Sequence, residues 1–245
     1  GQSLDRQRDE LNLLRWLNER HAAHRTSTLD LEGRIAAYEV AYKMQTEAPE
    51  LIDIGDETEA TKTLYGIDES DTDTFGRQCL LARRMVERGV RFVKLLHGRG
   101  KPWDQHGGIK GKLPQLCREV DKPVTGLLHD LRSRGLLEDT LVVWASEMGR
   151  TPWDSNLTQS DPGRDHNNYS LVMWMAGGNV RGGVSYGKPD EWSLRSADEH
   201  VHIRDVHATL LHLMGLDQEK LTYLYAGRFE RLTDFGGRVI REILA

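Results

Sequence analysis

Histidine and carboxylate side chains gather in three short segments of the chain. These segments are residues 103–108 (WDQHGG), 146–152 (SEMGRTP) and 163–168 (GRDHNN). The candidate metal ligands within them are Asp104, His106, Glu147, Asp165 and His166. A mixture of imidazole and carboxylate ligands suits zinc, manganese or iron. Glycines beside each group let the loop approach an ion or a small anion closely, so the first hypothesis is a divalent-metal site.

Each segment also has an ordinary structural explanation. An Asp-x-His pair such as Asp104 and His106 is typical of a surface Asx turn beside a solvated histidine. Glu147 fits a structural ion pair with Arg150 or Arg164 equally well. Position favours a shared polar site, because all three segments lie beside expected strands. In parallel sheets, ligands bind beyond the carboxyl ends of the strands.

The N-terminal third of the chain is predicted to be helical. Apolar residues recur there at offsets of three and four, which is the spacing of one helix face. One helix is expected to begin near Ser3, and a second to run from Asp30 to just before Pro49. A third is expected over residues 74–88. The acidic stretch 50–72 is expected to be a loop.

From residue 90 onward the pattern changes to alternating strands and helices. Short apolar runs predict strands at 90–96, 140–145 and 171–176. Amphipathic spacing predicts helices over 116–131 and 203–213. Strands that alternate with crossover helices indicate an α/β fold, with a mostly parallel sheet and helices on both of its faces.

Length and composition set broad limits on the chain. We expect its 245 residues to form one α/β domain, with a helical section over 1–89 and a core over 90–245. The net charge of −5 argues against a nucleic-acid partner, and no apolar run reaches the roughly 18 residues of a membrane span. Cys79 and Cys117 do not make a disulfide framework, and Cys79 lies on the apolar face of its helix as a core residue would.

Several segments together resemble one bacterial family, the domain of unknown function numbered 1501, whose members are often labelled sulfatases. The matching segments are residues 103–107, 135–143, 147–152, 163–166, 176–183 and 205–216. The resemblance covers essentially the whole chain. It implies similarity to the alkaline phosphatase and sulfatase superfamily, in which a parallel α/β sheet holds one or two divalent metals at its carboxyl edge.

The resemblance also implies roles for individual residues. Asp104 and His106 match an Asp…His pair that binds one metal, and His166 matches the late histidine that returns to it, with Asp165 beside it. Glu147 stands where a carboxylate binds the other metal. The next position of that motif is histidine in the superfamily and methionine here, and methionine is a poor ligand for such ions. One ion, or none, therefore fits this sequence better than two.

The leading functional hypothesis is a metal-dependent hydrolase of sulfate or phosphate esters, with an anionic ester such as a sulfated carbohydrate as substrate. Arg150 and Arg164 are expected to contact the ester, since guanidinium groups bind tetrahedral oxyanions in a bidentate manner. The alternative is a catalytically inactive binding or structural protein that keeps the fold. Ser146 as a nucleophile toward carboxyl esters is the least favoured reading, because no Gly-x-Ser-x-Gly elbow is present.

No residue is nominated as the catalytic nucleophile. In the superfamily it follows an early strand, and no strand is expected here before residue 90. With Gly rather than Met at position 1, we expect the chain to be the C-terminal portion of a longer protein. The family resemblance further suggests export to the periplasm or beyond.

Overall fold

The computed structural model describes most of the chain: residues 3–22, 29–156, 158, 160–234 and 236–245. The chain divides into two compact units, Gly1–Thr58 and Glu59–Ala245. Each unit is described by itself below. The candidate ligands all lie in the second unit.

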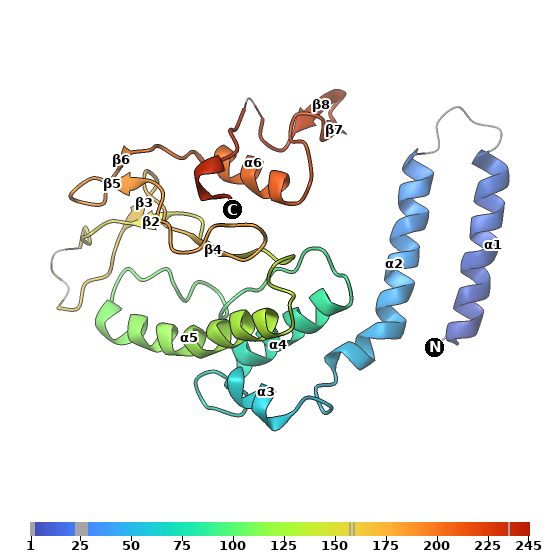
Figure 1. Ribbon diagram of the computed structural model, residues 1–245, viewed down its shortest axis with the longest axis horizontal. Helices are drawn as coiled ribbons and strands as arrows, with labels where there is room; N and C mark the ends of the chain where they lie inside the picture. The colour runs from blue at the N-terminus through green and yellow to red at the C-terminus, as the bar shows by residue number, and fades with distance from the viewer. Residues whose placement is uncertain (1–2, 23–28, 157, 159, 235) are drawn as a thin grey trace. The chain divides into compact units, whose positions relative to one another are not determined.

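The first unit is a helical hairpin. Helix α1 (Leu4–Ala22) and helix α2 (Leu29–Ile52) run side by side in opposite directions (Figure 1). The Glu39 carboxylate joins them, because it accepts hydrogen bonds from Arg8 at 3.1 Å and from Arg15. The hydrogen bond from Arg8 is also the main reason that the pKa of Glu39 is lowered.

Both helices were expected from the sequence, but the expected end of α2 before Pro49 is wrong. The helix continues through Pro49 to Ile52. Proline lacks an N–H donor, yet its carbonyl still accepts, and here it takes a hydrogen bond of 3.1 Å from Asp53 N. A proline near the end of a helix therefore does not stop it.

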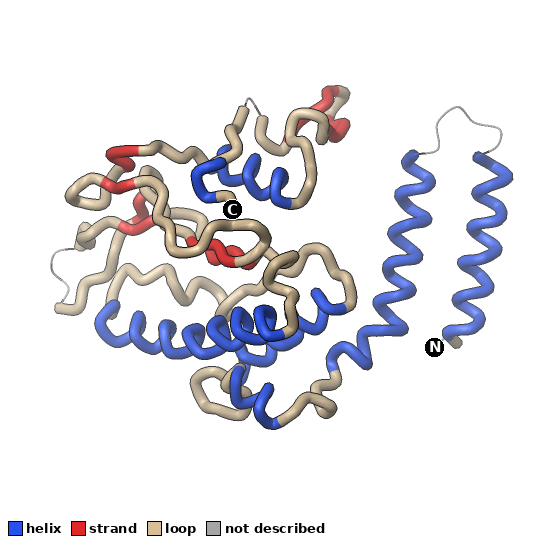
Figure 2. The backbone as a smooth tube through the Cα atoms, viewed as in Figure 1, coloured by secondary structure: helices blue, strands red, loops and turns tan. Residues whose placement is uncertain are grey.

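The helices of the second unit are α3 (Glu59–Leu64), α4 (Asp73–Glu87), α5 (Ile109–Ser133), α6 (Ile203–Leu213) and the 3-10 helix η1 (Arg241–Ile243). Helices α3, α4 and α5 lie together on one side of the second unit, and the short strands lie on the other side together with α6 and the C-terminal 3-10 helix (Figure 2). The predicted helices over 74–88, 116–131 and 203–213 are confirmed, while a further short helix falls inside the stretch 50–72 that was expected to be a loop.

In the part of the second unit that the structure describes, the strands form four separate two-stranded sheets, and each of these pairs is antiparallel. They are β1 (Val142–Trp144) with β4 (Trp174–Ala176), β2 (Gly149–Arg150) with β3 (His166–Asn167), β5 (Lys188–Pro189) with β6 (Ser196–Asp198), and β7 (Thr222–Tyr225) with β8 (Arg228–Arg231).

The predicted α/β fold with a mostly parallel sheet and helices on both faces is therefore wrong. The run at 90–96 forms no strand, and its Phe92 is 75% exposed. The expected strands at 140–145 and 171–176 do form in part, as β1 and β4, but they pair antiparallel with Trp144 opposite Trp174. Among the residues between β1 and β4 that the structure describes, none forms a helix, and a parallel pair needs such a crossover.

A core between α4 and α5 supports the rest of the second unit. Its buried apolar side chains include Phe75, Leu80, Leu116, Val120, Leu127 and Leu131. Cys79 is fully buried among these elements, which confirms its predicted core position, and burial raises the pKa of its thiol to about 12. The buried Asp130 carboxylate accepts a 3.0 Å hydrogen bond from Tyr65 and pairs with Arg83 and Arg134.

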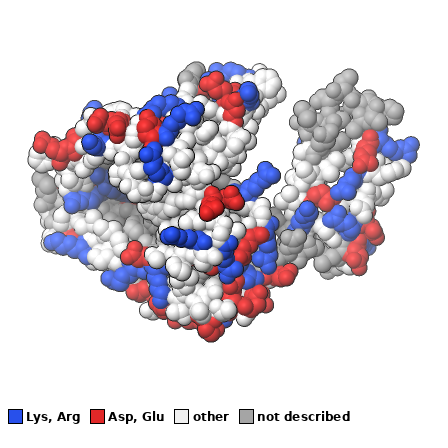
Figure 3. Space-filling view, in the orientation of Figure 1, with Lys and Arg blue, Asp and Glu red and all other residues white. Residues whose placement is uncertain are grey.

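The surface carries charges of both signs. Lys and Arg are interspersed with Asp and Glu over the face shown in Figure 3, without one large area of a single sign. Among the helices of the described residues, none combines the length and the hydropathy that a bilayer crossing requires.

Candidate metal centre

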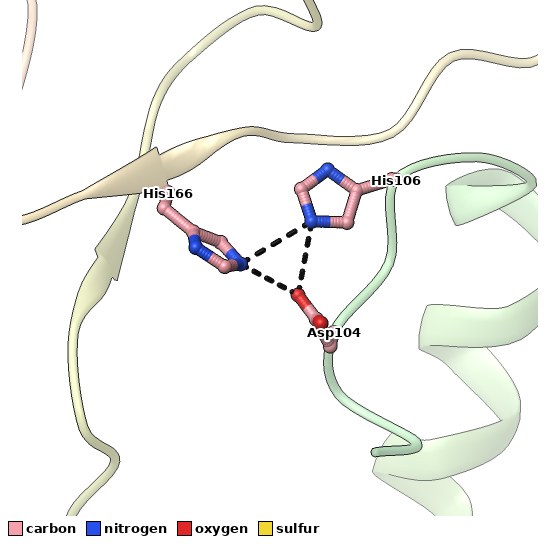
Figure 4. Close-up of side chains that lie close together, drawn as sticks. All are labelled: Asp104, His106 and His166. Atoms are coloured by element: carbon pink, nitrogen blue, oxygen red, sulfur yellow. Dashed lines mark hydrogen bonds and ion pairs between the residues drawn. The ribbon is translucent and has the colours of Figure 1, made fainter.

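Three of the predicted ligands meet at one point in the second unit (Figure 4). Asp104 Oδ1 lies 2.8 Å from His166 Nε2 and 3.1 Å from His106 Nε2. The two Nε2 atoms lie 3.2 Å apart. All three donor atoms fall within 4.8 Å of one another. We call Asp104, His106 and His166 the ligand cluster.

Two loops and one short sheet position the ligand cluster. Asp104 and His106 lie on the loop that leads into α5, and His166 lies on β3 (Figure 4). β3 pairs with β2 in a register that puts Arg150 opposite His166. Residues directly opposite each other on two antiparallel strands project to the same face of the sheet, so the Arg150 side chain lies on the same face as His166.

The two ligand-bearing loops are held together through their backbones. Arg164 N donates to the carbonyl of Gln105 at 2.9 Å, and Gly107 forms a β-bridge with Pro162. Gly163 is buried in this contact, where a Cβ atom would lie only 2.2 Å from Gln105 O. Only glycine allows so close an approach of the two backbones.

A buried carboxylate that the sequence analysis missed fixes this contact. Asp154 Oδ2 accepts the N–H of Gly163 at 2.8 Å, and its Oδ1 accepts the N–H of Asn156 at 2.8 Å. Hydrogen bonds from these two backbone groups lower the pKa of Asp154. The Asp-Ser-Asn run at 154–156 was the available signal, because such residues fold back on neighbouring N–H groups.

Electrostatics keep Asp104 ionised. Its Oδ1 accepts from the Arg150 guanidinium at 2.7 Å as well as from His166. The hydrogen bond from His166 lowers the pKa of Asp104 most, followed by the hydrogen bond from Arg150. A carboxylate ligand must be deprotonated, so Asp104 is ready to bind a cation. The side chains of His106 and His166 are 48% and 45% exposed, which leaves the cluster open to solvent.

Asp165 lies behind the ligand cluster rather than in it. Its Oδ1 is 3.5 Å from His106 Nδ1, the ring nitrogen that faces away from Asp104. Its Oδ2 accepts the N–H of Ser155 at 2.7 Å, which holds the carboxylate in place. A carboxylate on the second ring nitrogen is a common arrangement for metal-binding histidines, since it fixes the ring and raises its basicity.

Of the other predicted site residues, Glu147 and the Arg164 side chain are not part of the ligand cluster, whereas Arg150 contacts it through Asp104. Glu147 is exposed and is not among the mutually close donor atoms, so its role as a ligand stays a prediction. Glu147 was also considered as an ion-pair partner of Arg150, but Arg150 pairs with Asp104 instead. Arg164 contributes its carbonyl, which accepts from Arg150 at 3.4 Å, while its side chain lines a neighbouring cavity.

A half-buried aromatic network supports the loop that carries Asp104. Trp103 Nε1 donates to His97 Nδ1 at 3.0 Å, so the His97 proton lies on Nε2, which is 3.1 Å from Glu119 Oε2. Glu119 belongs to α5, and the Trp103 ring also makes an edge contact with Trp144 of β1. Trp103 thereby ties the loop to both the main helix and the first sheet.

Comparison with known proteins gives a family and no activity. The sequence profile of the family described as "Protein of unknown function (DUF1501)" matches residues 1–244. No curated protein and no solved structure matches the chain.

Proposed function

The chain belongs to the DUF1501 family, and we propose, from the geometry of the ligand cluster, that it binds one divalent metal ion and hydrolyses anionic phosphate or sulfate esters. The observation that carries this proposal is the convergence of Asp104, His106 and His166 from segments 60 or more residues apart. A relationship to alkaline phosphatases and sulfatases is part of the proposal. It rests on the ligand types, an Asp-x-His pair and a later His.

The donor atoms fit the size of a metal ion. Their separations are 2.8, 3.1 and 3.2 Å. With metal–ligand bonds of about 2.0–2.1 Å, the edge of a tetrahedron is about 3.3 Å. Two imidazole nitrogens and one carboxylate oxygen are ligands that zinc, manganese and iron accept. Small movements of exposed side chains would therefore complete a three-residue site with room for an external ligand.

Charge favours an anion as that external ligand. The Asp104 carboxylate is balanced by the Arg150 guanidinium, which contacts the same oxygen atom at 2.7 Å. A divalent ion added to this balanced pair leaves the centre positive, even with Asp165 nearby. Guanidinium groups hydrogen-bond phosphate and sulfate oxygens well, so Arg150 is placed to bind and orient the ester.

A divalent ion bound there supplies Lewis-acid polarisation of an ester oxygen. The chain's own residues orient the participants. Asp165 contacts the ring of His106, and Arg150 holds the carboxylate of Asp104 through Nη1, so its other guanidinium nitrogens would be the donors to a bound anion. The exposure of both histidines leaves water access to the centre, which hydrolysis requires.

A non-catalytic metal-dependent binding protein is the second candidate, and the position of Ser146 favours it. Its Oγ, in the segment after β1, donates to the carbonyl of Met148 at 3.0 Å, a local contact that does not involve the ligand cluster. If Ser146 does not act as a nucleophile, hydrolysis would depend on water. Binding of the anion without turnover would identify this second function.

Metal analysis of purified protein tests the site. After growth with zinc or manganese we expect one equivalent of bound ion in the wild type and in His21→Ala, whose histidine lies on α1 in the other unit. His106→Ala and His166→Ala should lose the ion, because each removes one of three ligands. Equal metal content in all four proteins would show that the ligand cluster is not the site.

Turnover of aryl phosphates and aryl sulfates then separates the two functions. A metal-dependent hydrolase releases phenol from one of these substrate classes in the wild type and not in His166→Ala. Arg150→Gln keeps all three ligands, and we expect it to raise KM for the anionic ester. Stoichiometric metal without any turnover would leave the binding protein as the function.

A further inference from the structure

A cavity of about 390 Å³ lies beside the ligand cluster and is built from the same loops. One wall follows Arg150 in the chain, a second precedes His166, and a third is the first turn of α5, just after His106. The side chains that characterise it are Ile109, Lys110, Pro152, Trp153, Pro162 and Arg164. Its volume lies in the range of pockets that take small organic ligands, about 300–1,000 Å³.

The lining has a distinct chemistry. Ile109, Pro152, Trp153 and Pro162 present apolar surface, and Trp153 is 47% exposed there. Apolar walls with an accessible indole favour a planar ring, which stacks on or packs edge-to-face against the tryptophan. A sugar, in contrast, needs many hydrogen-bonding side chains around its hydroxyl groups.

Two cationic side chains complete the cavity. Within the described residues, no carboxylate forms an ion pair with the side chain of Arg164 or Lys110, although Asp161 Oδ1 accepts the backbone N–H of Lys110 at 3.4 Å. The one acidic residue in the lining is Asp154, and both of its oxygen atoms already accept backbone N–H groups. Arg164 and Lys110 are therefore available to an anionic group of a ligand.

We propose that this cavity binds an aromatic anion, with the ring against Trp153 and the anionic group against Arg164 and Lys110. This inference deepens the proposed function. It rests on that function in one respect: the reacting group of the ligand is taken to be the ester that binds at the ligand cluster. The Arg164 carbonyl accepts from Arg150 at 3.4 Å, and Arg150 contacts Asp104 Oδ1 at 2.7 Å, so the cavity wall at Arg164 adjoins the ligand cluster. The substrate class is thus an aryl phosphate or aryl sulfate.

Two non-hydrolysable probes test the cavity: phenylphosphonate and methylphosphonate, titrated by calorimetry into the full chain with and without zinc. We expect phenylphosphonate to bind about tenfold more tightly than methylphosphonate, because only it places a ring on Trp153. Trp153→Ala should remove this preference, and Arg164→Gln should weaken both compounds. Trp16→Ala and Arg34→Gln, both in the first unit, are matched controls and should behave as the wild type.

The two proposals fail in different ways. Equal affinities for the two phosphonates, or no binding of either, would overturn the cavity proposal whatever the metal content. A tenfold preference that persists in metal-free protein and disappears in Trp153→Ala supports the cavity even if the ligand cluster binds no ion. Elemental analysis of the same samples reports on the ligand cluster independently.

Discussion

Replacing Gly163 by alanine should separate the two loops that carry the ligand cluster. A Cβ atom at this position would lie 2.2 Å from Gln105 O, 2.3 Å from His106 C and 2.4 Å from Gly107 N. All three are backbone atoms, which cannot rotate away as a side chain does. The φ of Gly163 lies outside the positive region, so the effect of the substitution is steric and not a matter of backbone strain.

The required movement sets the size of the effect. Ordinary van der Waals contact begins at 3.4 Å, so the loops must part by 3.4 − 2.2 = 1.2 Å. That displacement breaks the 2.9 Å hydrogen bond from Arg164 N to Gln105 O and pulls His166 away from Asp104. Changes behind a metal site typically cost about 10- to 100-fold in affinity, and overpacking costs about 1–3 kcal/mol of stability.

Zinc affinity measured by competition with a chromophoric chelator is the assay, with thermal unfolding of the metal-free protein as a second readout. Gly111→Ala is the matched control, since it lies nearby on α5 with nothing within 4 Å of its added Cβ. We expect Gly111→Ala to keep wild-type affinity and to gain about 0.5–1 kcal/mol in helix stability. Wild-type zinc affinity in Gly163→Ala would refute the claim that this close contact positions the ligands.

Other measurements check the surrounding structure. In native protein near pH 8, a thiol reagent should modify the exposed Cys117 and spare Cys79, and denaturant should release the second thiol. Burial raises the pKa of the Cys79 thiol to about 12. The stability that the neutral thiol contributes is therefore complete below its unfolded pKa of about 8.5 and is lost as pH rises toward 12. Alkaline unfolding, monitored by circular dichroism, should shift to higher pH in Cys79→Ala. Tyr65→Phe removes a hydrogen bond to the buried Asp130 carboxylate and should cost about 1.5–3 kcal/mol in chemical denaturation without changing metal content. Zinc at a hundredfold excess over Kd should stabilise the wild type by about 2.7 kcal/mol in thermal unfolding, and no shift would contradict metal binding to the native state.

The helices were predictable because their signals are local. Apolar spacing located α4, α5 and α6, and glycines in the left-handed region follow each of them, as at Gly89 and Gly215. A helix satisfies its backbone within its own segment, so its sequence carries most of the information needed. The same local logic failed at Pro49, which lies inside the last turn of α2 instead of after its end.

The sheet was not predictable in this way, because a strand depends on a partner far away in the chain. The apolar run at 90–96 has the composition of a strand, yet it pairs with nothing among the described residues. β1 and β4 do form, but hydrophobicity alone does not distinguish a parallel from an antiparallel pair. The sequence did not determine how the strands pair. Because the helices were interpreted as crossovers between parallel strands, the predicted fold class was wrong.

The structure brings Asp104, His106 and His166 together, but not on the scaffold that was predicted for them. The prediction placed these residues at the carboxyl edge of a parallel sheet, whereas antiparallel pairing of β2 with β3 and backbone contacts between loops bring them together. Residue types, neighbouring glycines and the family resemblance pointed to these segments, and none of these signals determines the architecture. Glu147 was grouped with them through the assumed sheet edge and the family resemblance, and it is not among the mutually close donor atoms.

A site made from loops has a consequence for how this unit is stabilised. His166 and Asp104 are 62 residues apart, and among the described residues a two-residue sheet, backbone hydrogen bonds and the Asp154 carboxylate hold their loops together. A metal ion shared between them would close this long loop and would restrict the chain there. Binding and local folding would then be one equilibrium, and the residues that hold the loops, above all Gly163 and Asp154, would control metal affinity without contacting the ion.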